Sequence, residues 1–128
     1  MPLIVRTEQK ALDAYVVAPS GQIDGHTHSI LEDELDSIIA KNPTLIALDM
    51  TDVDYLSSAG IRVIFKTKKA LKAGSGKLVF MHLQPQIKKV FEIIEALPSM
   101  RVFKNTQEMD EYLDQMQKQV TGEITEED

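Results

Sequence analysis

The chain has 128 residues, no cysteine, no tryptophan and a formal net charge of −6, and this length suits one domain with an apolar core. The lack of cysteine excludes disulfides and thiolate metal sites and fits the cytoplasm, and the acidic balance argues against sequence-independent nucleic-acid binding. No apolar run approaches the roughly 20 residues of a membrane span, and the first ten residues do not resemble a signal peptide.

The N-terminal third predicts a β-hairpin followed by a helix. Apolar clusters at residues 3–5 and 15–17 flank the polar stretch TEQKALD (7–13), which predicts two strands joined by a turn. The second strand is expected to end at SGQID (20–24). Apolar residues at helical spacing in 27–40 predict a helix that begins near Thr27 or His28 and stops at KNP (41–43).

The rest of the chain alternates strands and helices. TLIALDM (44–50) and KLVFMHL (77–83) are typical of strands buried on both faces. Helices are predicted from Ser58 to a C-cap at Gly74 and over 84–97, with Pro85 in the first turn. RVF (101–103) predicts a brief strand, and 106–119 a last helix with Thr106 as its N-cap.

This order, β-β-α-β-α-β-α-β-α, predicts an α/β fold. An N-terminal hairpin followed by β-α units implies a mostly parallel mixed sheet of about five strands with four helices. We expect one domain over residues 1–119. The residues 120–128 are acidic and without periodicity, which predicts a disordered tail.

Two loops are expected at the edge of the sheet where ligand and partner sites gather, beyond the carboxyl ends of parallel strands. They are GQIDGHTH (21–28) and DYLSSAG (54–60). If the strands behind them are neighbours, Asp24 and Ser58 share one rim. The sequence leaves the strand order open.

Ser57 and Ser58 stand where the second predicted helix begins. Serine is a favoured N-cap, but one cap needs only one hydroxyl. Ala59 and Gly60 keep the neighbouring side chains small, so we expect Ser58 to be exposed and open to a kinase. A phosphate would bring about −1.5 to −2 charges, which a helix N-terminus tolerates but a partner packed on this rim does not.

Chemical alternatives at the same rim are weaker. His26 and His28 lie near Asp24, but no third strong ligand is evident, so no metal site is expected. Ser58 as a hydrolase nucleophile would need the pattern Gly-x-Ser-x-Gly, and the first glycine is missing.

A basic stripe follows the serines. Arg62, Lys66, Lys69 and Lys72 recur at three- and four-residue spacing. The main interpretation is a solvated helix face, and the alternative is a contact with an acidic patch on a partner.

The segment DVDYLSSAGIRVI (52–64) resembles the signature of STAS-domain anti-sigma factor antagonists, also called anti-anti-sigma factors. GQID (21–24) resembles the family's Gly-x-Ile/Leu-Asp block, and PQIKKVFEIIEAL (85–97) resembles its third helix. The resemblance covers about residues 3–117, with the blocks in the family's order. It implies a STAS-like fold for residues 1–119.

The resemblance also implies a function. Family members are not enzymes; they bind an anti-sigma factor that is also a serine kinase, and so free a sigma factor. Phosphorylation of one serine switches them off, and a metal-dependent serine phosphatase restores them. That serine corresponds here to Ser58, with Ser57 as the second choice because it replaces the aspartate that many members have at this position. No cofactor is implied. The expected partner-binding residues are Asp24, Ser57, Ser58, Ala59, Gly60 and Arg62.

Two other classes of function stay open. One is a STAS scaffold or regulatory subunit in another assembly, such as a stress-sensing complex or a lipid-transport machine, because one fold serves many uses. Neighbouring genes for a kinase-like anti-sigma factor and a phosphatase would favour the first hypothesis, and transporter genes the second. An enzyme using Ser58 would require label transfer from a substrate without any partner protein.

Overall fold

The computed structural model describes residues 3–96 and 105–122. Its elements, in chain order, are β1 (Ile4–Ala11), β2 (Ala14–Ile23), α1 (His28–Ile39), β3 (Leu45–Asp49), β4 (Asp52–Leu56), α2 (Ser58–Ala73), β5 (Lys77–Met81), α3 (Pro85–Ala96) and α4 (Thr106–Thr121). The predicted α/β class is confirmed, with five strands and four helices in these two ranges.

The five strands form one mixed sheet in the order β1-β2-β3-β5, with β4 also paired to β2. Only the β1–β2 hairpin is antiparallel; the β2–β3, β2–β4 and β3–β5 pairs are parallel. Strand β2 is ten residues long, so it pairs with β3 through its first half and with β4 through its second half. This arrangement brings the ends of β2 and β4 together.

Two details of the strands differ from the expectation. The turn of the hairpin is only Leu12 and Asp13, because the polar residues before it continue β1 along the exposed edge of the sheet. The strand β4 was not predicted, because the sequence favoured a loop in this segment. The predicted strand RVF (101–103) lies outside the described residues.

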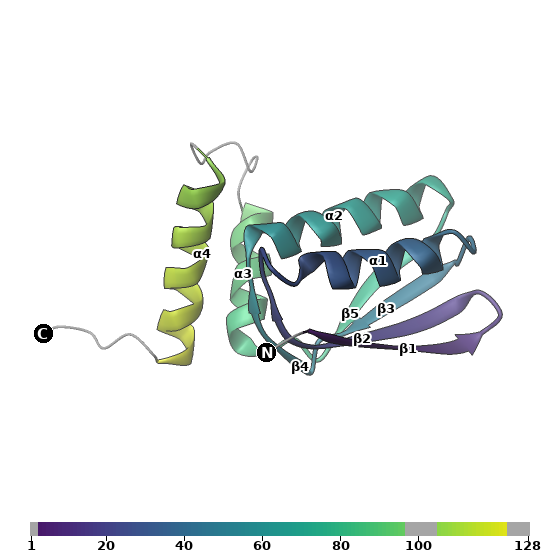
Figure 1. The fold of residues 1–128 in the computed structure, drawn as a ribbon, viewed down its shortest axis with the longest axis horizontal. Coiled ribbons are helices and arrows are strands. Elements are labelled where there is room, and N and C mark those ends of the chain that lie inside the picture. Colours follow the sequence, from purple (N-terminus) through teal and green to yellow (C-terminus); the bar gives the residue numbers. More distant parts are fainter. Residues whose placement is uncertain (1–2, 97–104, 123–128) are drawn as a thin grey trace, which may run out of the picture.

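Helices α1 and α2 lie side by side over one face of the sheet, while α3 and α4 stand across the end where α1 and α2 begin (Figure 1). One apolar core joins these layers and includes Leu48, Leu56 and Ile64, each at most 1% exposed. None of the helices in the described ranges is long and apolar enough to cross a bilayer.

Helix α4 is longer and differently capped than the sequence predicted. Its N-cap is Asn105, not Thr106, and the Asn105 side chain accepts a hydrogen bond from the Glu108 N–H at 2.8 Å. The helix continues through Thr121 and ends at Gly122, whose φ of 79° suits glycine. Residues 120 and 121, which were expected in the tail, are thus helical, and residues 123–128 lie outside the described residues.

Candidate functional site

The two loops expected at one rim do lie side by side. Strands β2 and β4 are parallel neighbours, with Gln22 opposite Tyr55 and Ile23 opposite Leu56. Beyond the last pair, the Ser57 N–H donates to the Ile23 carbonyl at 2.9 Å. The strand order thus answers the question that the sequence left open: the loops that carry Asp24 and the two serines share an edge.

Asp24 orders its own loop. Its Oδ1 accepts hydrogen bonds from the His26 N–H at 2.9 Å and the Thr27 N–H at 3.1 Å. In return, the Asp24 N–H donates to Thr27 Oγ1 at 2.9 Å, and that hydroxyl donates to the Gln22 carbonyl at 2.7 Å. These bonds hold the turn that leads into α1, so Asp24 has a structural role whatever else it contacts.

The expectation that Ser58 is exposed is wrong. Ser58 is 0% exposed and Ser57 is 6% exposed, and neither hydroxyl oxygen has a hydrogen-bond partner within residues 3–96 and 105–122. The small neighbours that were expected to leave Ser58 open do not expose it, and Asp110 of α4, far along the chain, contacts this corner. A kinase could not reach Ser58 in this conformation.

Neither serine caps α2 with its side chain. Ser57 occupies the N-cap position with extended backbone but makes no side-chain cap bond. Instead, Asp110 Oδ1 of α4 accepts a hydrogen bond from the Ser58 N–H at 2.9 Å. A carboxylate is well placed there, since the first amides and the dipole of a helix favour an anion. The cap therefore comes from another element.

The other expected partner-binding residues divide by exposure. Arg62 is exposed and Ala59 is half-buried, whereas Gly60 is buried. A Cβ on Gly60 would lie 2.6 Å from Leu56 Cδ1 and 2.7 Å from Ile23 Cγ2. Glycine is needed here for close packing of α2 on the sheet, and Gly60 presents no surface to a partner in this conformation.

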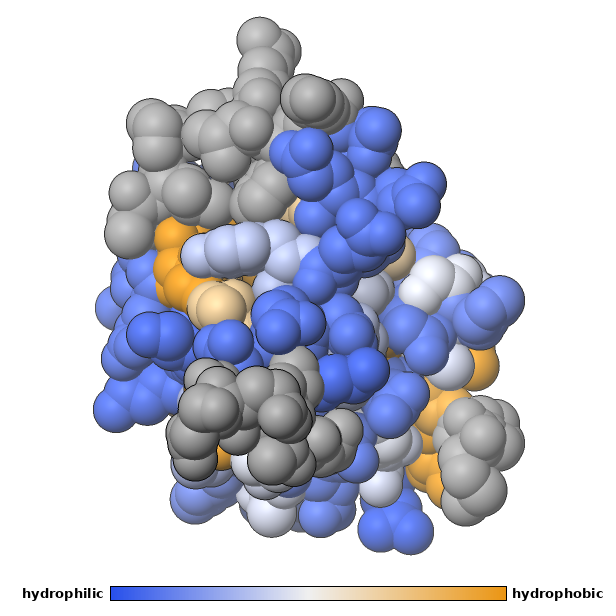
Figure 2. Space-filling view, turned by 90° about the vertical axis from the view of Figure 1, so that its left-hand side faces the viewer, coloured by the Kyte–Doolittle hydropathy of each residue, from blue (hydrophilic) through white to orange (hydrophobic). Residues whose placement is uncertain are grey.

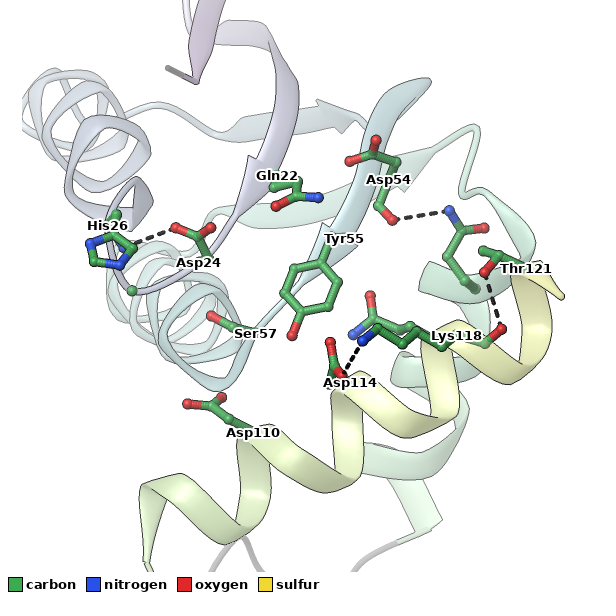
Figure 3. A pocket seen from close by; sticks show the side chains of 13 residues that line it. Gln22, Asp24, His26, Asp54, Tyr55, Ser57, Asp110, Asp114, Lys118 and Thr121 are labelled. Carbon is green, nitrogen blue, oxygen red and sulfur yellow. Dashed lines mark hydrogen bonds and ion pairs between the residues drawn. The ribbon is translucent and has the colours of Figure 1, made fainter. Parts of the chain in front are cut away.

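A cleft of about 490 Å³ opens beside Ser57, between the rim and α4. Tyr55, Asp24 and Ser57 face Asp110 and Asp114 of α4 across it (Figure 3). Burial, followed by the charge and hydrogen bond of Asp114, raises the pKa of Tyr55 to about 12. Four aspartates and one lysine, Lys118, line the cleft, so its lining is mainly acidic and disfavours a further anion.

Gln117 is the residue that closes this corner, and it was not among the expected site residues. Its Oε1 accepts from the Leu56 N–H at 2.9 Å, and its Nε2 donates to the Leu56 carbonyl at 2.8 Å. Gln117 is only 2% exposed. It follows the buried Met109 and Leu113 at intervals of four residues, so a polar residue on an apolar helical stripe was the signal in the sequence.

The outer surface on the α4 side of the molecule is mostly hydrophilic, with hydrophobic atoms towards the sides of the view (Figure 2). This agrees with an amphipathic α4 whose buried Met109 and Leu113 turn inward. The side of α4 that faces away from the core is thus polar.

The alternative chemistries find no support in the geometry. In residues 3–96 and 105–122 there is no group of three histidine, cysteine or acidic side chains that could hold a metal ion. No histidine or carboxylate is hydrogen-bonded to the hydroxyl of Ser57 or Ser58, so neither oxygen has a general base in contact.

Lys66, a residue of the basic stripe, forms ion pairs within the molecule. Lys66 Nζ lies 2.7 Å from Glu32 Oε2 and 3.3 Å from Asp36 Oδ2, both on α1. The hydrogen bond with Lys66 lowers the pKa of Glu32. Lys69 and Lys72 are exposed, as a solvated face requires.

Known proteins resemble the chain in sequence and in fold. BtrV of Bordetella bronchiseptica, named as a candidate anti-sigma factor antagonist, is 37% identical over 73 residues, 57% of this chain and 63% of BtrV. The match therefore spans less than two thirds of BtrV. The anti-sigma-B factor antagonist of Listeria monocytogenes is 25% identical over 93 residues, covering 73% of this chain and 82% of that protein.

Among solved structures, SpoIIAA of Bacillus in its phosphorylated form has a TM-score of 0.61 with 19% identity, over 70% of this chain and 82% of SpoIIAA. At this identity the likeness shows the fold alone. The sequence model of the STAS domain family matches residues 5–109, which include both loops of the rim, the two serines and most of the sheet. The chain belongs to the STAS domain family.

Proposed function

We propose that the chain is an anti-sigma factor antagonist controlled by phosphorylation of Ser58. In its unmodified form it binds an anti-sigma factor with serine kinase activity, and a sigma factor is thereby released. The kinase transfers the γ-phosphoryl group of ATP to Ser58 Oγ, with loss of the hydroxyl proton and release of ADP. A serine phosphatase hydrolyses the phosphoester and restores binding.

Membership of the STAS family and the names of relatives such as the Listeria antagonist support this proposal. The observation that carries it furthest is local. Ser58 is the first residue of α2, and its N–H already holds an anionic oxygen, Asp110 Oδ1, at 2.9 Å. A phosphate on the same residue would find the same favourable helix N-terminus.

The burial of Ser58 adds a condition. Transfer requires the hydroxyl oxygen to approach the γ-phosphorus directly, and both Ser57 and Ser58 hydroxyls are enclosed. Phosphorylation on this proposal therefore takes place in a conformation in which the hydroxyl is uncovered, and we infer that α4 has then left the rim.

The test incubates the chain with its cognate kinase and ATP, followed by mass spectrometry of the intact protein and its peptides. We expect one phosphate on Ser58, none in Ser58→Ala, and unchanged modification in the matched variant Ser57→Ala. Ser58→Ala phosphorylated to the same extent as the unmodified sequence would refute the site.

Binding supplies the second half of the test. Ser58→Glu should bind the anti-sigma factor at least tenfold more weakly, since a charge is placed in a contact made with a neutral residue. Ser58→Gln is the matched neutral control of similar size. Equal binding of Ser58→Glu and Ser58→Gln would contradict a switch that works by charge.

A further inference from the structure

We propose that α4 is a removable cover over the serine corner, held shut by Asp110 and Gln117, and that partner docking and modification at Ser58 proceed from the uncovered form. The part of this inference that concerns docking and modification at Ser58 rests on the proposed function. The cover itself rests only on contacts between α4 and the rim, and it is tested separately below.

The first contact of the cover is Asp110 on the N-terminus of α2. In most helices the N-cap side chain belongs to the residue just before the helix. Here Ser57 leaves that role unfilled, and Asp110, 52 residues away from Ser58, takes it. The covering helix thus occupies the place that an incoming anion would take.

The second contact is Gln117 on the edge of β4. Strand β4 pairs with β2, and the Leu56 N–H and carbonyl turn towards α4, where the Gln117 carboxamide bonds both. A primary amide offers one acceptor and one donor side, as a neighbouring peptide group does. Gln117 therefore takes the position of a paired strand at an edge that a partner protein could otherwise use.

The two serine hydroxyls weaken the closed form. Each is buried with no hydrogen-bond partner in the part of the chain that the structure describes, a state that costs free energy. On this proposal water relieves that cost once α4 moves. Met109 and Leu113, at most 3% exposed, oppose opening through their apolar contacts. A cover held by these apolar contacts and by two polar ones, and opposed by two unpaired hydroxyls, is suited to opening without unfolding of the sheet.

Thiol labelling measures the opening without any kinase. The chain has no cysteine, so Ser58→Cys introduces a single, nearly isosteric thiol beneath the cover. Its thiolate attacks the disulfide of an aromatic disulfide reagent; a mixed disulfide forms and the aromatic thiolate leaves, which is followed by absorbance. The rate reports how often the corner is uncovered.

In the Ser58→Cys background, Gln117→Ala should raise the labelling rate about 10- to 100-fold, because the covered state loses both bonds to Leu56 and leaves those groups buried and unpaired. Asp110→Ala should raise it by about tenfold through loss of the α2 cap. Gln107→Ala is the matched control, since Gln107 is exposed on the same helix and its side chain donates to the Glu111 carboxylate at 3.4 Å. Equal rates in Gln117→Ala and Gln107→Ala would overturn the proposal.

A low concentration of urea separates opening of α4 from global unfolding. Opening of one helix exposes little surface, so the labelling rate should rise only shallowly with urea, whereas labelling through the unfolded chain follows the full equilibrium slope. The full slope in both Ser58→Cys and Ser58→Cys with Asp110→Ala would show that α4 does not move alone, and the cover would be rejected.

The kinase assay then separates this inference from the proposed function. With the native Ser58, Gln117→Ala should be phosphorylated faster than Gln107→Ala. Equal rates of phosphorylation would reject the cover while the proposed function stands. Fast thiol labelling in Gln117→Ala, combined with no phosphorylation of any variant by the cognate kinase, would support the cover and reject the proposed function.

Discussion

Replacement of Gly60 by alanine tests the packing beneath the serine turn. The new Cβ would lie 2.6 Å from Leu56 Cδ1 and 2.7 Å from Ile23 Cγ2. Both of these side chains are 0% exposed, so they can retreat only by displacing other core atoms. The substitution therefore overpacks the junction of β2, β4 and α2.

The magnitude follows from two opposing effects. Overpacking of a core costs about 1–3 kcal/mol, while alanine in place of glycine returns up to about 1 kcal/mol of helix propensity. Taken near the middle of both ranges, the net loss in the free energy of unfolding should be about 1–2 kcal/mol. With a urea m-value of about 2 kcal/mol/M, the midpoint should fall by about 0.5–1 M.

Urea unfolding followed by far-ultraviolet circular dichroism measures this shift. Gly25→Ala is the matched control, because a Cβ on Gly25 finds nothing within 4 Å, and its free energy of unfolding should stay within about 0.5 kcal/mol of the parent. If Gly60→Ala and Gly25→Ala unfold at the same urea concentration, the close contacts at Gly60 do not constrain the fold and the reasoning is refuted.

Two titrations extend the test to the charged groups. Hydrogen bonds from Thr51 hold the pKa of Asp49 below its ordinary value. The stability that such a carboxylate contributes is present above its unfolded pKa and is lost as the pH falls through its folded pKa. Thr51→Val should therefore raise the Asp49 pKa measured by NMR and make the loss of stability below about pH 4 smaller. For Tyr55, whose pKa is raised to about 12, the folded state favours the neutral phenol and loses stability as pH rises above about 10. Asp114→Asn should lower the pKa of Tyr55 in an ultraviolet titration, and Tyr55→Phe identifies which part of the signal belongs to this phenol. An unchanged Tyr55 pKa in Asp114→Asn would contradict the role of Asp114.

Periodicity predicted the helices well but missed one strand. The apolar spacing of α1 and α2 is strong, and both begin where their sequences indicated. Strand β4 has five residues, with only Val53 and Leu56 fully buried and acids at Asp52 and Asp54. The alternation of Asp52, Val53 and Asp54 is a strand signal too short to decide by itself, and the extended form also depends on pairing with the second half of β2.

The rim was predictable, but its accessibility was not. The motif placed Ser57 and Ser58 at the start of a helix, and the structure agrees. Two residues of α4 bond the backbone at this corner, Asp110 at Ser58 and Gln117 at Leu56, from 52 and 61 residues away. A local motif can therefore indicate the position of a serine within the fold without indicating whether another protein can reach it.

Competition for one amide connects the cover to the switch. Asp110 already accepts from the Ser58 N–H, and the adjoining cleft also holds Asp24, Asp54 and Asp114. A phosphate on Ser58 would bring about two further negative charges to this place and would be repelled by Asp110, so both anions could not occupy the α2 N-terminus together. The phosphorylated chain would thus favour the open form. On this reasoning the kinase can reach Ser58 only when α4 has opened. The phosphatase would find phosphorylated Ser58 exposed, because the phosphate itself favours the open form.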